Sequence, residues 1–126
     1  MQTLEDFSDC GLPAKLKQQP DASGVHRTLD VILASQPFRT SKQCQNLLRY
    51  IVEHSLQEED GSLRERILGV EVFHRAGDYD TSEDPVVRTR ASDIRKRLAQ
   101  FYQANEHDPS LVHIELKSGS YRATFR

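Results

Sequence analysis

Apolar residues recur at three- and four-residue steps along most of the chain, which predicts a series of amphipathic helices. The longest such stretch covers residues 85–102. Its apolar stripe consists of Val87, Ala91, Ile94, Leu98 and Phe101. Asp84 directly before Pro85 suits an N-cap followed by proline at the first helical position. We therefore expect one long helix here, with a single buried face.

Three shorter helices are predicted ahead of it. The first covers residues 23–34 and is expected to end because of Pro37. The second covers residues 41–56, and Thr40 with Gln43 has the spacing of a capping box at its start. The inner faces of these two helices consist of Val25, Leu29, Ile32 and Leu33, and of Cys44, Leu47, Leu48, Ile51 and Val52.

The third predicted helix is short, covering residues 63–72. Ser62 with Glu65 forms a second potential capping box, and Ile67, Leu68 and Val72 are the expected buried positions. Gly69 lowers helix propensity by about 1 kcal/mol relative to alanine. A glycine at such a point indicates the close approach of another helix.

After residue 110 the apolar period changes from helical to two. Val112, Ile114 and Leu116 alternate with polar residues, residues 117–120 have turn composition around Gly119, and residues 121–125 return. This pattern predicts a β-hairpin. The expected fold class is mainly α with a C-terminal β-hairpin, formed by residues 23–126. Residues 1–22 show no sustained period and are interpreted as a flexible leader.

Length and composition predict one small domain, because the chain has 126 residues and a net charge of −2. It has no run of 18 apolar residues, and its first residues lack the basic and apolar regions of a secretory signal. We therefore expect a cytoplasmic domain. Cys44 lies in an apolar stripe and is expected to be a buried thiol, and a disulfide between Cys10 and Cys44 is not expected in that compartment.

Charge is distributed unevenly, and this changes the picture. Residues 85–105 hold five basic residues and one acidic residue, a local charge of +4. The side opposite the apolar stripe carries Thr89, Ser92, Asp93 and Lys96, flanked by Arg88 and Arg95 on one side and by Arg90 and Arg97 on the other. This pattern is typical of a helix that enters a DNA groove. The alternative is a solvated surface helix rich in arginine.

The basic helix follows the three shorter helices and directly precedes the hairpin. The hairpin turn reads KSGS, and the return strand begins YR. This order indicates a winged helix-turn-helix. IRKRL (residues 94–98) and VHIELKSGSYRATF (residues 112–125) resemble the end of the OmpR/PhoB-type effector domain. Over residues 25–126 the chain is most similar to an uncharacterised winged-helix domain of acidobacterial proteins. In those proteins the domain usually lies at the N-terminus, ahead of a membrane segment and a TolB-like or TPR region.

The resemblance implies sequence-specific binding to double-stranded DNA by a transcriptional regulator or its DNA-binding module. The candidate DNA contacts are Arg88, Thr89, Arg90, Ser92, Arg95, Lys96, Arg97, Lys117 and Arg122. A single such domain contacts few base pairs, so dimers or tandem sites are expected. In the OmpR/PhoB family the loop before the basic helix contacts RNA polymerase or lies near DNA. Residues 73–84 are therefore a candidate surface for RNA polymerase or another protein.

The chain departs from the OmpR/PhoB pattern. Ser92 and Asp93 stand where those regulators often have two arginines, and Asp93 opposes DNA binding unless it accepts from cytosine or pairs with Arg90, Arg97 or Lys96. The glycine of the turn is displaced, and the N-terminal sheet of that family is not expected here. The alternative function is a winged-helix protein–protein interaction module that does not bind DNA, which the net negative charge and Asp93 favour.

Other chemistry has little support in the sequence. Asp78, Asp80, Ser82 and Asp84 alternate as in a calcium loop, but the glycine and final glutamate of an EF-hand are absent. The chain has no zinc-type spacing of histidine and cysteine, no phosphate-binding glycine motif and no nucleophile motif. We therefore expect no metal, no cofactor and no enzymatic activity.

Overall fold

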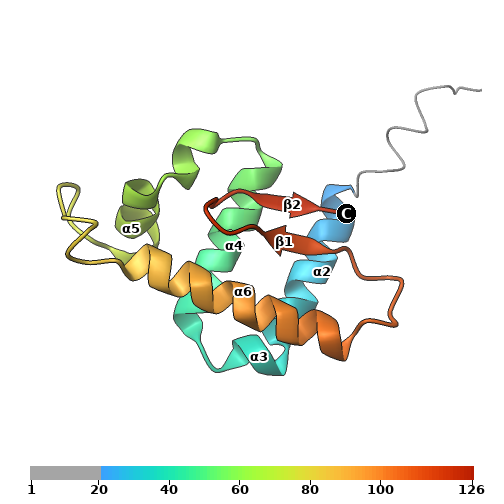
Figure 1. Cartoon of the computed structure of the whole chain (residues 1–126). Helices are drawn as coiled ribbons and strands as arrows, with labels where there is room; N and C mark the ends of the chain where they lie inside the picture. The colour runs from blue at the N-terminus through green and yellow to red at the C-terminus, as the bar shows by residue number, and fades with distance from the viewer. Residues whose placement is uncertain (1–20) are drawn as a thin grey trace, which may run out of the picture.

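A computed structural model describes residues 21–126. Within this range the fold is mainly helical, with five α-helices and one antiparallel pair of short strands near the C-terminus (Figure 1). The elements are α2 (Ala22–Ala34), α3 (Gln36–Arg39), α4 (Lys42–Leu56), the 3-10 helix η1 (Asp60–Leu63), α5 (Glu65–Phe73), α6 (Val86–Ala104), β1 (Ile114–Leu116) and β2 (Ala123–Phe125). Helix α4 lies at the centre and contacts α2, α3, α5, α6 and β2. None of the helices in residues 21–126 is both long enough and apolar enough to cross a bilayer.

Helix α2 begins slightly earlier than predicted, and α3 was not predicted. The Asp21 carboxylate caps α2 by accepting a hydrogen bond from Gly24 N at 2.8 Å, so Asp21 and Ala22 belong to the folded domain. Residues 1–20 of the predicted leader lie outside the described residues. Pro37 does not end α2, which stops at Ala34. It lies instead in the first turn of α3, where the missing proline N–H breaks no helical hydrogen bond.

The predicted caps of α4 and α5 are both wrong. The Ser41 hydroxyl caps α4 by accepting from Cys44 N at 3.2 Å, because Thr40 already terminates α3. Ser62 lies in η1, and the extended Arg64 then precedes α5 without a side-chain cap. Helix α5 therefore begins at Glu65, two residues later than predicted, and a 3-10 turn precedes it.

Two expectations about α5 are also corrected. Leu68 is buried as predicted, but Ile67 is 38 % exposed, and Phe73 extends α5 and enters the core. Gly69 does permit a close approach, although the neighbour is the side chain of Tyr79 rather than another helix. A Cβ atom at Gly69 would lie 2.0 Å from the Tyr79 hydroxyl oxygen.

The apolar stripe of α6 is confirmed, because all five of its predicted members are buried. The predicted cap is not. Helix α6 begins at Val86 after Pro85, and no side chain caps it. The Asp84 carboxylate instead accepts from Arg75 Nε at 2.6 Å, a charge-assisted bond that takes the place of a bond to the helix N–H groups.

The two strands pair in antiparallel register, with Ile114 opposite Phe125 and Leu116 opposite Ala123. Gly119 in the turn has φ +82°, a left-handed conformation that favours glycine. Buried hydroxyls bind the outer edges of the hairpin. Thr28 Oγ1 accepts from Val112 N, and Ser55 Oγ accepts from Ala123 N, each at 2.9 Å. The hairpin is thereby fastened to α2 and α4.

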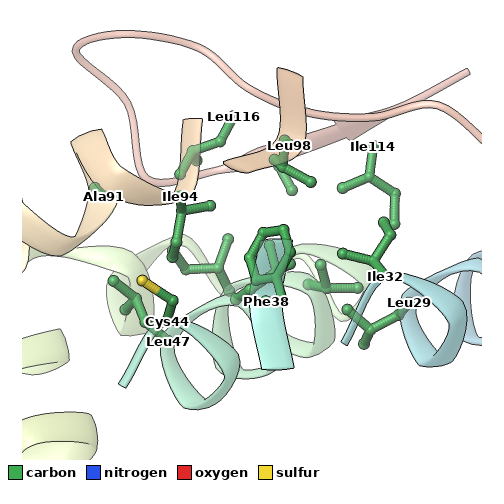
Figure 2. Packing of buried hydrophobic residues seen from close by; sticks show 14 of the residues in the cluster. Leu29, Ile32, Phe38, Cys44, Leu47, Ala91, Ile94, Leu98, Ile114 and Leu116 are labelled. Atoms are coloured by element: carbon green, nitrogen blue, oxygen red, sulfur yellow. The ribbon is translucent and has the colours of Figure 1, made fainter. Parts of the chain in front are cut away.

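The core lies between α2, α4, α6 and the hairpin (Figure 2). Phe38 from α3 is fully buried among side chains of the neighbouring helices. Cys44 is a buried free thiol, as predicted. Residues 36–39 carry no periodic signal of their own, so the sequence did not reveal that they contribute one of the largest core side chains.

Candidate nucleic-acid interface

The exposed face of α6 brings together most of the predicted DNA contacts. Six residues line one shallow depression, namely Arg88, Thr89, Arg90, Ser92, Asp93 and Lys96. They converge because α6 buries the opposite stripe against α4, α3 and α5. Thr89, Ser92 and Lys96 are exposed along the middle of this face. Of the nine predicted contacts, five are therefore neighbours on one helical surface.

Asp93, the acidic residue of this face, is paired internally. Its carboxylate accepts from Arg97 Nε at 3.0 Å and from the Cys44 thiol at 3.3 Å, and it lies 3.5 Å from Arg90 Nη1. Burial raises the pKa of Asp93, but the bonds from Arg97 and Cys44 and the charges of both arginines outweigh burial and lower it. The pairing with Arg90 and Arg97 meets one of the conditions under which Asp93 is compatible with a DNA-binding face.

The arginines around this face also hold protein groups. Arg90 Nε donates to Gln43 Oε1 at 2.7 Å, which links α6 to the first turn of α4. Arg88 Nη2 donates to Thr81 O at 2.6 Å, and its Nε lies 3.2 Å from a carboxylate oxygen of Glu65. A guanidinium has five N–H donors, so each of these arginines keeps donors free toward solvent.

Arg97 turns away from the shared depression, toward α3. Its Nη1 donates to the Pro37 carbonyl and, at 3.2 Å, to Thr40 Oγ1. Together with its bond to Asp93, these contacts make Arg97 a bridge between two helices. The positive charge predicted for the outer face of α6 is to this extent used inside the protein.

The hairpin residues occupy two different places. Lys117 is exposed in the turn beside α6, where Arg95 donates to its carbonyl oxygen. Arg122 contacts η1 instead, through an ion pair with Asp60. It lines a separate depression with residues from the end of α4. Within residues 21–126, three of the predicted cationic contacts form no ion pair with a carboxylate, namely Arg95, Lys96 and Lys117.

Sequence reasoning identified the basic residues but missed what holds them. Gln43 lies 47 positions from Arg90, and Thr40 lies 57 positions from Arg97. Helical periodicity relates residues only a few positions apart, so no sequence pattern could have revealed these partners. Among the described residues, no group of three or more histidine, cysteine, aspartate or glutamate side chains is arranged to hold a metal ion.

Comparisons with protein-family models, with curated proteins and with solved structures found no match to this chain. The resemblance to the OmpR/PhoB-type and acidobacterial winged-helix domains therefore stays a prediction. Function must therefore be inferred from the geometry of α6 and the hairpin.

Proposed function

We propose that this chain is a winged helix-turn-helix domain that binds double-stranded DNA, as a cytoplasmic transcriptional regulator or its DNA-binding module. The observation that carries the proposal is the cationic outer face of α6 with a basic hairpin turn beside it. In this arrangement α6 enters the major groove and the hairpin is the wing. Because the chain as a whole has a charge of −2, DNA must dock on this local surface.

Each group has a distinct role in the proposed complex. Thr89, Ser92 and Lys96 lie where an inserted helix comes closest to base edges, and a hydroxyl or an ammonium can hydrogen-bond to them. Arg88 and Arg90 direct their free donors to phosphates at the rim of the groove. Lys117, on the wing, contacts the phosphate backbone of the DNA. Arg122 reaches a phosphate only after exchanging its ion pair with Asp60.

A single domain of this size reads few base pairs. We therefore propose that two copies bind adjacent half-sites, as a dimer or on tandem sites. No enzymatic reaction, metal or cofactor is part of this proposal.

The test is a binding titration of labelled duplexes at several salt concentrations, with the preferred site first selected from a random library. Lys117→Ala should weaken preferred and random duplexes alike and lower the slope of log affinity against log salt by about one unit. Lys96→Ala should cost about 1–3 kcal/mol on the preferred site and much less on random DNA. Arg27→Ala on α2, an exposed cation outside the proposed surface, is the matched control.

The outcomes separate sequence-specific recognition of bases from electrostatic attraction to phosphates. If Lys96→Ala weakens both duplexes equally, α6 is only a phosphate clamp and sequence reading is lost from the proposal. If the unaltered protein binds no duplex even at low salt, DNA binding is wrong.

A protein-interaction module is then the second candidate, with residues 73–84 as the surface for RNA polymerase or another protein. This loop is held in place, because Arg66 Nη1 donates to Tyr79 O at 2.5 Å and to Gly77 O at 3.2 Å. Such a fixed acidic loop can present one shape to a partner. Asp78→Ala and Asp80→Ala should then each weaken capture of purified RNA polymerase.

A further inference from the structure

Arg95 is the predicted DNA contact whose side chain donates the most hydrogen bonds to the hairpin. Its Nε donates to Leu116 O at 3.0 Å, and its Nη2 donates to Lys117 O and Ser120 O at 3.1 Å each. These three carbonyls stand at the end of β1 and at both ends of the turn. The half-buried guanidinium of a residue midway along α6 thus holds the whole turn.

The strand register explains why a partner is needed there. His113 and Arg126 exchange both backbone hydrogen bonds, at 2.8 and 2.9 Å. Hydrogen-bonded and non-hydrogen-bonded pairs alternate in an antiparallel ladder, so Leu116 and Ala123 form a pair without bonds between the strands. The Leu116 carbonyl therefore points away from β2, toward α6. Without Arg95 this edge would lack its hydrogen-bond partner.

Tyr102 does the same for the other end of β1. Its hydroxyl accepts from Ile114 N and donates to Val112 O, both at 2.7 Å. Burial raises the pKa of Tyr102 to about 12, so the phenol keeps its proton and remains a donor. Arg95 and Tyr102 are seven residues apart and share one face of α6. Together they give the outer edge of β1 the partners that a third strand would otherwise supply.

We propose that Arg95 is a positioning residue: with Tyr102 it fixes the distance and angle between the hairpin turn and α6, rather than reading DNA itself. This inference rests on the proposed function for its consequence on DNA. The carbonyl that Arg95 holds at the start of the turn belongs to Lys117, and the next residue along α6 is Lys96. One guanidinium thereby sets the spacing between the proposed groove-facing lysine and the proposed phosphate-facing lysine.

The first test needs no DNA. Within residues 117–122, the N–H groups of Ser120 and Arg122 are hydrogen-bonded inside the turn. In Arg95→Ala their amide hydrogen exchange should accelerate by about ten- to a hundredfold, as expected from losing bonds to a charged donor. Exchange in α4 should stay unchanged. Arg95→Lys should behave like Arg95→Ala, because an ammonium lacks the planar fork that spans three carbonyls. The control is Arg90→Ala, which removes a cation of the same helix that bonds to Gln43 and not to the hairpin.

The second test measures the coupling of Arg95 to Lys117 on DNA. If Arg95 acts through the hairpin, Arg95→Lys weakens binding in the unaltered protein but has little further effect in a Lys117→Ala background. A direct phosphate contact predicts additive effects, with Arg95→Lys keeping most of the affinity and the salt slope. Additive effects of that kind would overturn the positioning role on DNA.

The two tests fail independently. Unchanged exchange in residues 117–122 of Arg95→Ala overturns the inference, whether or not DNA binds. If neither the unaltered protein nor any variant binds DNA, the proposed function fails. The exchange measurement alone then decides whether Arg95 positions the hairpin.

Discussion

At the scale of single residues, some cationic side chains of α6 bind other parts of the protein, and others face solvent. Arg95 and Arg97 use several donors on backbone carbonyls and on a carboxylate, which suits the planar fork of a guanidinium. Lys96 remains a solvated point charge on the outer face. A charge of +4 over residues 85–105 therefore overstates the charge that is free to meet a ligand.

Two histidines should titrate in opposite directions from the ordinary value. A hydrogen bond to Glu53 raises the pKa of His26, against the opposing effect of burial. Burial and then the charge of Arg126 lower the pKa of His113. The His113 ring is tilted by 30° against the Tyr102 ring, with 4.3 Å between the ring centroids. NMR titration of the ring protons should show His26 above and His113 below the midpoint of a model peptide.

The two shifts have opposite consequences for stability. The His26 contribution is fully present below the unfolded pKa and is lost as pH rises through its folded pKa. For His113, protonation favours the unfolded chain, so stability falls as pH drops below the unfolded pKa. In denaturation at pH 5 and pH 8, His113→Gln should reduce the loss of stability at the lower pH. A loss as large as in the unaltered protein would contradict this assignment.

At the scale of elements, Gly69 and Tyr79 join α5 to the loop that follows it. Alanine at position 69 would improve helix propensity by about 1 kcal/mol, but its Cβ would overlap the Tyr79 ring. The ring is held, because the Arg66 guanidinium lies 5.5 Å from its centroid. We expect the overlap with Tyr79 to cost more than the gain in helix propensity, so that Gly69→Ala lowers the free energy of unfolding by about 1–3 kcal/mol.

Chemical denaturation of Gly69→Ala, Tyr79→Ala, the double variant and Gly61→Ala checks this. In a Tyr79→Ala background the overlap is gone, and Gly69→Ala should then be neutral or stabilising. Gly61→Ala is the control, since its added Cβ would meet no atom of another part of the fold within 4 Å. A stabilising effect of Gly69→Ala in the unaltered protein would show that the loop yields without cost.

The elements that the sequence predicted best are those with the longest apolar stripes. The stripes of α4 and α6 repeat over several turns and were confirmed residue by residue. The four residues of α3 are too few to show a period. Thr40 and Ser41 compete for the same cap, and only the tertiary position of α3 decides between them. Periodicity therefore predicted which helices pack, and it could not predict how they begin.

The candidate site follows the same rule. Helical spacing predicted that Thr89, Ser92 and Lys96 share an exposed face. It could not predict that Arg122 pairs with Asp60, 62 positions away. Such pairings depend on how η1 and the hairpin are placed by the rest of the fold.

At the scale of the whole molecule, stability depends on one core shared by helices and hairpin. Leu48 and Ile94 are fully buried on α4 and α6. Leu48→Ala or Ile94→Ala should each lower the free energy of unfolding by about 2–5 kcal/mol. Val31 is 47 % exposed on α2, so Val31→Ala should change it by less than about 0.5 kcal/mol. Equal effects for Ile94→Ala and Val31→Ala in urea denaturation would refute this core.

The Thr28 and Ser55 hydroxyls that fasten the hairpin have a consequence for the order in which the domain is made. Their partners, Val112 and Ala123, lie 84 and 68 positions further along the chain. During synthesis at about 5–20 residues per second, Thr28 and Ser55 are therefore made several seconds before those partners exist. A nascent chain ending at residue 110 should therefore be helical by circular dichroism, bind the dye ANS and unfold without a cooperative transition. Release of a longer chain would then close the core in one late step, and a cooperative transition in the shorter chain would exclude that order.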